Sequence, residues 1–209
     1  MILLAIDDHS LPFVRHLTYY LSKPEVHREP VLTPSSGDPH APDRQAAHFY
    51  GTVLHDEGKY RMWYYAKFQE RAKPHESSMT CYAESDDGIR WRKPPLGQKL
   101  VGGSRSNNAI DLPGIQTYGA CVIKDEEDPD SRRRYKMVYN PLQESGPVAD
   151  RFGQPVSTIG TATSPDGISW TARTDWPVDV FCEESSFFKH DGMYVVHGQG
   201  IFYGGGEGG

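Results

Sequence analysis

Two adjacent glutamates, Glu183 and Glu184, stand directly before an aromatic stretch that reads Ser-Ser-Phe-Phe-Lys. Cleavage of a glycosidic bond needs one carboxylic acid beside the leaving oxygen and a second carboxylate that activates water or attacks the sugar. Repulsion between close carboxylates helps to keep one of them protonated. Adjacent residues of an extended strand point to opposite faces, so each glutamate needs another partner. Either glutamate is therefore a candidate for such a carboxyl group, and for Glu183 the alternative interpretation is a surface carboxylate at a strand entrance.

A histidine and four aromatic residues complete the set of candidates. His48 suits the role of a base, because histidine titrates near neutral pH; alternatively it is only a polar residue near the start of a strand. Aromatic faces suit sugar rings, so Tyr50, Trp63, Tyr118 and Phe188 are predicted to bind a saccharide by stacking. Glu184 is the fifth predicted binding residue. Aromatic residues on strands also build hydrophobic cores, and the sequence leaves that alternative open for each of them.

An internal repeat indicates the elements that position these residues. Residues 83–91 read Ala-x-Ser-x-Asp-Gly-Ile-x-Trp, and the same pattern returns 79 positions later at 162–170. A second repeat lies upstream: Tyr60 opens Tyr-Arg-Met-Trp-Tyr, Tyr135 opens Tyr-Lys-Met-Val-Tyr, and Tyr194 opens a fainter copy. Asp-Gly favours a tight hairpin turn. Each repeat therefore predicts several short antiparallel strands.

Four strands per repeat is the layout of one propeller blade. The predicted pairs are 51–55 with 59–66, 79–85 with 89–92, 119–124 with 134–139, and 157–164 with 168–172. The repeated Trp91 and Trp170 are expected to pack between neighbouring sheets, because one blade cannot bury both of its faces alone. The alternative for these two indoles is a ligand-stacking platform.

The run from Glu183 to Tyr194 resembles the third-blade motif of the five-bladed propeller glycoside hydrolases, families 32, 43, 62, 68 and their relatives. In that motif a glutamate is followed by an aromatic residue five positions later, then by a basic residue, a turn glycine and a Tyr-rich strand. Phe188 and Gly192 match the aromatic residue and the glycine. The Ser-x-Asp-Gly-x-x-Trp hairpins are also similar to those of these families. The resemblance implies a saccharide ligand and a general acid at Glu183.

The innermost strand of each propeller blade lines a central channel, and the candidate innermost strands are 48–54, 118–123 and 183–189. Two carboxylates of the family pattern are absent from them: the first strand has His-Phe-Tyr-Gly, and the second has Tyr-Gly-Ala-Cys, where an Asp-Pro is expected. The loop carboxylates that could substitute are Asp38, Asp43, Asp111 and Glu207. The sequence therefore leaves a second function open, a non-catalytic propeller that binds a saccharide or a protein. A six-bladed sialidase is less favoured, because its Asp-box has one more residue between Asp and Gly.

Composition and charge exclude several classes. The net charge of −6 and the single short basic run give no nucleic-acid footprint. No stretch of about 18 apolar residues predicts a membrane span, and the three cysteines are too scattered for a zinc pattern or a disulfide framework. No cofactor is expected, although the sequence leaves open a calcium ion in the predicted channel. The amino terminus shows no signal peptide. If the given sequence starts inside a longer natural chain, a signal peptide can lie in the part that precedes it, and the protein would then be secreted or periplasmic.

The predicted organisation is an extended leader and loop (1–45), a first blade (46–110), a second blade (111–178) and the start of a third (179–209). A propeller needs at least about four blades to close. We therefore expect an all-β, incomplete five-bladed propeller whose remainder follows downstream. An open sheet edge at the third blade predicts poor stability or self-association.

Overall fold

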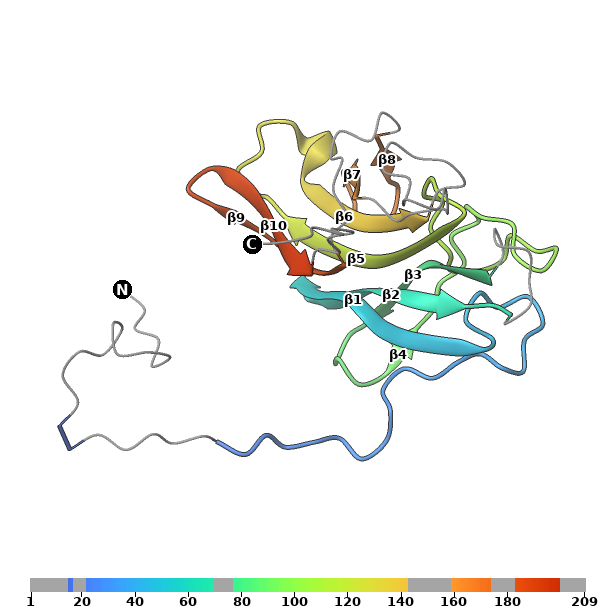
Figure 1. Ribbon diagram of the computed structural model, residues 1–209. Coiled ribbons are helices and arrows are strands. Elements are labelled where there is room, and N and C mark those ends of the chain that lie inside the picture. Colours follow the sequence, from blue (N-terminus) through green and yellow to red (C-terminus); the bar gives the residue numbers. More distant parts are fainter. Residues whose placement is uncertain (1–14, 17–21, 70–76, 143–158, 174–182, 200–209) are drawn as a thin grey trace, which may run out of the picture. The chain divides into compact units, whose positions relative to one another are not determined.

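The computed structural model describes residues 15–16, 22–69, 77–142, 159–173 and 183–199, with only the backbone at 183–185 and 199. The chain divides into two compact units, Met1–Pro30 and Val31–Gly209. All strands belong to the second unit (Figure 1). Residues 22–45, within the predicted leader and loop, form neither helix nor strand. The undecided stretch from Leu11 to Leu21 lies almost entirely outside the described residues.

The second unit is built from three antiparallel sheets (Figure 1). The first sheet has the order β1 (Ala46–Asp56), β2 (Lys59–Lys67), β3 (Ser78–Ser85), β4 (Trp91–Arg92). The second has the order β5 (Gln116–Lys124), β6 (Tyr135–Leu142), β7 (Gly160–Ser164), β8 (Thr171–Ala172), with the 3-10 turn η1 (Ser131–Arg133) between β5 and β6. The third pairs β9 (Glu183–His190) with β10 (Met193–Gln199).

This topology confirms the all-β prediction and the two four-stranded antiparallel repeats. Each four-stranded sheet keeps its strands in chain order, as successive hairpins require. In the described part of the chain no sheet closes on itself. The propeller and its number of blades therefore remain predictions.

The two Asp-Gly hairpins have the same local structure. The carboxylate of Asp87 accepts the backbone N–H groups two and three residues on, at 2.9 and 2.7 Å, and that of Asp166 accepts the corresponding groups at 2.8 and 2.7 Å. Gly88 and Gly167 have φ angles of 74° and 75°, a left-handed conformation that favours glycine. The repeated sequence thus encodes a repeated turn.

The main core lies between the first and second sheets. Trp63 on β2 is fully buried, and its indole N–H donates to the carbonyl oxygen of Gly167 at 2.9 Å. The Trp63 ring meets the Trp170 ring edge-on, with centroids 6.3 Å apart. Trp170 therefore packs between two sheets, as its place in the repeat predicts. Trp91 packs against the separate core on the other face of the first sheet.

One kind of junction joins the three sheets. Asp56, at the end of β1, accepts hydrogen bonds from the Lys124 ammonium at 2.6 Å and from the Tyr135 hydroxyl. The contacts that join the second sheet to the third are the same: Asp125 accepts from Lys189 at 3.0 Å and from the Tyr194 hydroxyl at 2.5 Å. These contacts therefore link the carboxyl ends of β1, β5 and β9 in chain order, and the amino ends of the three strands lie away from the contacts.

Candidate functional site

The first strand of each sheet carries a candidate residue at one equivalent position. The residues and their cross-strand partners are His48 with Tyr65, Tyr118 with Asn140, and Glu183 with Gln199. Each partner is the fifth residue after the first tyrosine in the second strand of its sheet. Although β9 is described only by its backbone here, its register places Glu183 where the other sheets have His48 and Tyr118.

A β-bulge follows each of these three positions. Regular pairing resumes only at Thr52 in β1, at Cys121 in β5 and at Ser186 in β9. Gly51 allows the β1 bulge, because a Cβ there would lie 1.9 Å from the carbonyl oxygen of Trp63. Gly119 allows the β5 bulge with a φ of 62°. Bulges bend a strand, re-aim its side chains and are frequent beside active sites.

The bulged ends of β1 and β5 gather an aromatic cluster. The Tyr50 and Tyr118 rings are stacked with centroids 6.1 Å apart, and Tyr65 approaches Tyr118 at 5.9 Å and His48 at 5.7 Å. His48 is exposed and the three tyrosines are half-buried. The structure thus brings together three residues that the sequence singled out, and adds Tyr65. Alternation along β2 was the signal for Tyr65, since it puts this residue on the face opposite Tyr64.

A small polar pocket shares Tyr65 with this cluster. The pocket has a volume of about 190 Å³ and is lined by Gln45, Tyr65, Lys67, Gln69, Ser77, Ser78 and Gln116. The Lys67 ammonium lies 5.8 Å from the centre of the Tyr65 ring, and the Ser78 hydroxyl donates to the Gln116 amide oxygen at 2.8 Å. Amides, hydroxyls and an ammonium beside half-buried aromatic rings suit a ligand that has both hydroxyl groups and apolar faces.

Two predicted binding residues lie elsewhere. Trp63 is sealed in the core between the sheets, so a saccharide cannot reach it and it is not part of this site. Phe188 lies further along β9 and is 44% exposed. The side chains of Glu183 and Glu184 are outside the described atoms, and only the register of β9 places them.

The loop carboxylates have other partners. Asp43 is fully buried and accepts hydrogen bonds from the Tyr64 hydroxyl at 2.9 Å and the Lys93 ammonium at 2.5 Å. Asp38 accepts the backbone N–H of His40 at 2.8 Å. These contacts stabilise the segment before β1 rather than the aromatic cluster. Asp111 is exposed, and Glu207 lies outside the described residues.

Within the described ranges, no group of three or more His, Cys, Asp or Glu side chains is placed to hold a metal ion. The described residues also contain no helix with the length and apolar character that a membrane span requires.

Neither a family model nor a curated protein matches the chain. A structure from Bacteroides ovatus ATCC 8483 that carries the provisional name of glycoside hydrolase is similar over 76% of this chain and 44% of its own, with 21% identity and a TM-score of 0.44. A structure from Parabacteroides distasonis ATCC 8503 with the same provisional name is similar over 80% and 48%, with 18% identity and a TM-score of 0.44. A third, named as an RGII complex, is similar over 66% and 60%, with 14% identity and a TM-score of 0.27. The protein spans less than half the length of the first two structures.

Proposed function

We propose that the amino ends of β1, β5 and β9 form a saccharide site, and that Glu183 acts there as the general acid that cleaves a glycosidic bond. The observation that carries the proposal is the equivalent register of His48, Tyr118 and Glu183 on three successive first strands. The resemblance of the run from Glu183 to Tyr194 to a propeller glycoside hydrolase motif supports the role of the glutamate.

The proposed architecture is an incomplete five-bladed propeller with the first strands innermost. Its support is the repeated junction, in which Asp56 and Asp125 each bind a lysine and a tyrosine of the following sheet. A constant contact between successive sheets relates them by a constant rotation, as propeller blades are related. The first strands then share one channel, and the site is at their amino ends.

In the proposed reaction, the Glu183 carboxylic acid donates its proton to the glycosidic oxygen while the bond from that oxygen to the anomeric carbon breaks. A water molecule adds to the anomeric carbon, and its proton passes to a base. His48 is the exposed candidate for this base. The faces of Tyr50 and Tyr118 hold the sugar ring, and the polar pocket next to Tyr65 binds its hydroxyl groups.

The test is hydrolysis of a panel of plant and bacterial oligosaccharides, measured as released reducing sugar. Glu183→Gln should lower kcat on any cleaved substrate by about 10²-fold or more, because a general acid contributes that much to the rate. The matched control is Glu184→Gln, which changes the neighbouring carboxylate and should retain most of kcat. Unchanged activity in Glu183→Gln, with both variants folded by circular dichroism, contradicts the proposed role.

A second function has its own support: His48, Tyr50, Tyr65 and Tyr118 form an aromatic cluster whose partly exposed rings suit binding without catalysis. A non-catalytic propeller would use it to bind a saccharide or a protein. Calorimetry that detects oligosaccharide binding, with no reducing sugar released during long incubation, favours this function. Released sugar that depends on Glu183 excludes it.

A further inference from the structure

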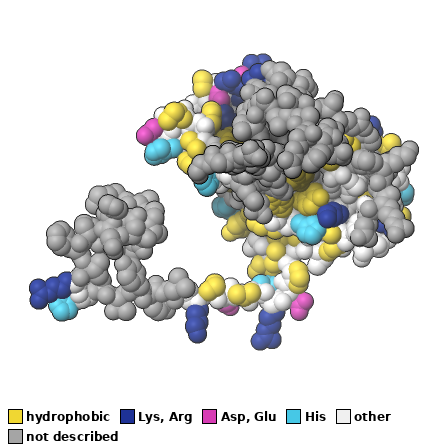
Figure 2. All heavy atoms as spheres, viewed as in Figure 1, with side chains coloured by type: hydrophobic (Ala, Val, Ile, Leu, Met, Phe, Trp, Pro, Cys, Tyr) yellow, Lys and Arg dark blue, Asp and Glu magenta, His cyan; other side chains and the backbone are white. Residues whose placement is uncertain are grey.

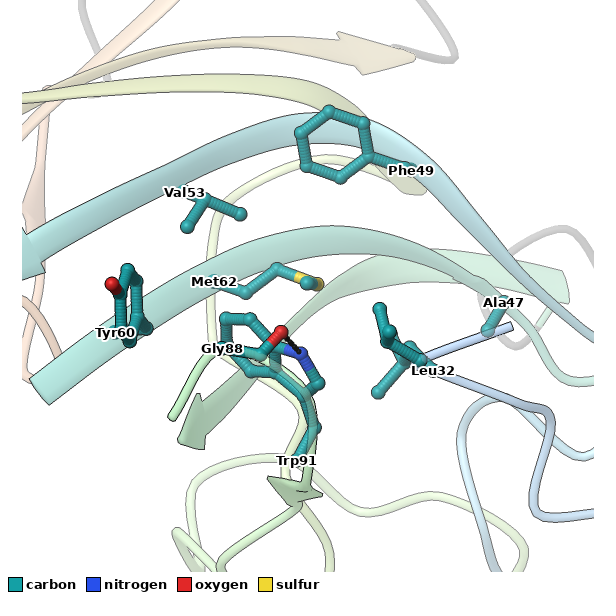
Figure 3. A pocket seen from close by; sticks show the side chains of 9 residues that line it. Leu32, Ala47, Phe49, Val53, Tyr60, Met62, Gly88 and Trp91 are labelled. Carbon is teal, nitrogen blue, oxygen red and sulfur yellow. Dashed lines mark hydrogen bonds between the residues drawn. The ribbon is translucent and has the colours of Figure 1, made fainter. Parts of the chain in front are cut away.

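A second, apolar pocket lies on the face of the first sheet that is opposite Trp63. It has a volume of about 450 Å³ and is lined by Val31, Leu32, Ala47, Phe49, Val53, Tyr60, Met62, Gly88 and Trp91. Figure 3 shows Val53, Tyr60 and Met62 on the strands, with Trp91 and Gly88 below them. Phe49 is 67% exposed, and Figure 2 shows hydrophobic side chains gathered at the surface in this part of the molecule. We call the set Tyr60, Met62, Gly88 and Trp91 the indole socket.

The second sheet contains the same socket, and there it is filled. Met62 pairs with Val53 as Met137 pairs with Val122, and the repeats align the remaining members. The equivalent residues in the second sheet are Tyr135, Met137, Gly167 and Trp170. They receive the indole of Trp63 from the first sheet: a Cβ on Gly167 would lie 3.1 Å from its ring and 3.3 Å from Tyr135. The open pocket of the first sheet therefore has the lining that holds an indole elsewhere in the same chain.

The glycine carbonyl groups show the same difference between the two sockets. The carbonyl oxygen of Gly167 accepts two indole N–H groups, from Trp170 at 3.1 Å and from Trp63 at 2.9 Å. The carbonyl oxygen of Gly88 accepts one indole N–H group, from Trp91 at 3.0 Å. Within the described residues, no second donor reaches this oxygen. The open socket thus offers an acceptor where the filled one binds the incoming indole.

A position for a carboxylate lies beside the indole socket. His55 and Tyr60 face each other across β1 and β2, with ring centroids 4.7 Å apart, in the register that Lys124 and Tyr135 occupy in the second sheet. Lys124 and Tyr135 bind the carboxylate of Asp56 from the preceding sheet. Of the residues that the structure describes, none hydrogen-bonds the Tyr60 hydroxyl. An incoming carboxylate would therefore find the tyrosine donor in the same place, next to a histidine.

We propose that this face of the first sheet docks a further antiparallel sheet, whose strands present a tryptophan to the indole socket and an acidic residue to His55 and Tyr60. The contact would reproduce the one that Trp63 and Asp56 make with the second sheet. A second copy of this chain fits poorly through its third sheet, because the register equivalents of Asp56 and Trp63 there are His190 and His197. The docked sheet is therefore one that the described residues do not contain.

The experiment uses the ¹⁵N-labelled chain and indole as the probe. Indole should shift the Trp91 indole N–H resonance, with a dissociation constant on the order of 1 mM, as expected for so small a ligand. Trp170 occupies the filled socket and is the internal control, so its resonance should stay in place. The probe 1-methylindole has no N–H donor and should bind about five-fold more weakly, since one hydrogen bond contributes about 1 kcal/mol.

Variants separate the socket from other sites. Tyr60→Ala should abolish the indole shift at Trp91, whereas Tyr65→Ala, on the opposite face of β2, should retain it. Val53→Lys narrows the pocket entrance from a partly exposed position and provides the same test should Tyr60→Ala fail to fold. The proposal is overturned if indole leaves Trp91 unshifted, if both indoles bind equally, or if a methyl glycoside displaces indole, which would identify a saccharide subsite. None of these outcomes depends on Glu183.

Discussion

The accessibility of an aromatic residue on β2 depends on its position along the strand as well as on the face that carries it. Trp63, Tyr64 and Tyr65 are consecutive on β2, and alternation puts Tyr64 on one face and Trp63 with Tyr65 on the other. The indole of Trp63 enters the core between two sheets and hydrogen-bonds Gly167. Tyr65 remains half-buried and contacts His48 and Tyr118. Only the latter is accessible to a ligand, so the two residues have different roles despite similar chemistry.

Truncation of the core indole should lower the stability of the folded chain. Trp63→Ala removes a fully buried side chain and should lower the free energy of unfolding by about 3–5 kcal/mol. Trp91→Ala is the matched control, since Trp91 is only partly buried beside an open pocket, and its cost should be smaller. Urea denaturation followed by circular dichroism measures both values. An equal or larger loss for Trp91→Ala would contradict the assigned packing.

At this scale the sequence predicts part of the site. His48, Tyr50 and Tyr118 stand near predicted strand entrances, and the structure brings them together. Trp63 cannot be told from Tyr65 by sequence, because both lie on the same face of β2 and only the neighbouring sheet determines which of them is covered. Glu183 is a candidate through its motif, and its register equivalence with His48 and Tyr118 emerges only once the strands are paired.

The hairpin is the element that the sequence specifies most completely. Its serine, aspartate and glycine each have a defined role: the serine hydroxyl oxygen accepts the glycine N–H at 2.9 Å in the first copy and at 2.8 Å in the second. The strand ends are harder to predict. β1 begins at Ala46, five residues before the predicted start at 51, because the bulge between His48 and Thr52 breaks the alternation by which strands are recognised.

The two turn glycines provide a matched pair of substitutions. Gly88→Ala should destabilise the chain by about 1–2 kcal/mol, because alanine is strained at a positive φ. Gly167→Ala should cost more, since its Cβ would meet Trp63 at 3.1 Å and Tyr135 at 3.3 Å, whereas the Cβ at position 88 would meet Tyr60 at 3.6 Å. Denaturant midpoints of the two variants decide the order. A larger loss for Gly88→Ala would show that its surroundings are not open.

At the scale of the molecule, charged junctions join one sheet to the next. The hydrogen bond from Tyr194, with that from Lys189, lowers the pKa of Asp125 to about 2, although burial opposes the shift. Burial also raises the pKa of Asp56, but hydrogen bonds from Lys124 and Tyr135 outweigh it and lower the pKa below its ordinary value. Both carboxylates thus bind a proton less readily in the folded chain than in the unfolded one.

This difference predicts acid sensitivity. A depressed pKa in the folded state contributes stability above the ordinary value of 3.8, and this contribution is lost as the pH falls toward 2. The urea midpoint should therefore fall steeply across this interval. Asp125→Asn should be less stable than the parent chain at pH 7, and the gap should narrow as the pH approaches 2. A gap that stays constant with pH would contradict an ionic role for Asp125.

The repeats predict the all-β class and the order of the strands, because each hairpin has local signals in the sequence. They do not predict how the sheets meet. The hydrogen bonds at Asp56 and Asp125 join residues far apart in the chain, such as Asp125 with Lys189 and Tyr194. No pattern within one repeat indicates such pairs. The same holds for the indole socket, whose ligand chemistry is apparent only from its filled counterpart.

The central claim is that a saccharide binds where the first strands bring His48, Tyr118 and Glu183 to one end. The most direct test is a crystal structure of the Glu183→Gln variant with an oligosaccharide that the parent chain binds or cleaves. We predict a sugar ring on the Tyr118 face, with a glycosidic oxygen within about 2.6–3.2 Å of the residue 183 amide. A saccharide bound instead at Trp91 in the indole socket, or one at Tyr118 with residue 183 beyond hydrogen-bonding reach, would contradict the account.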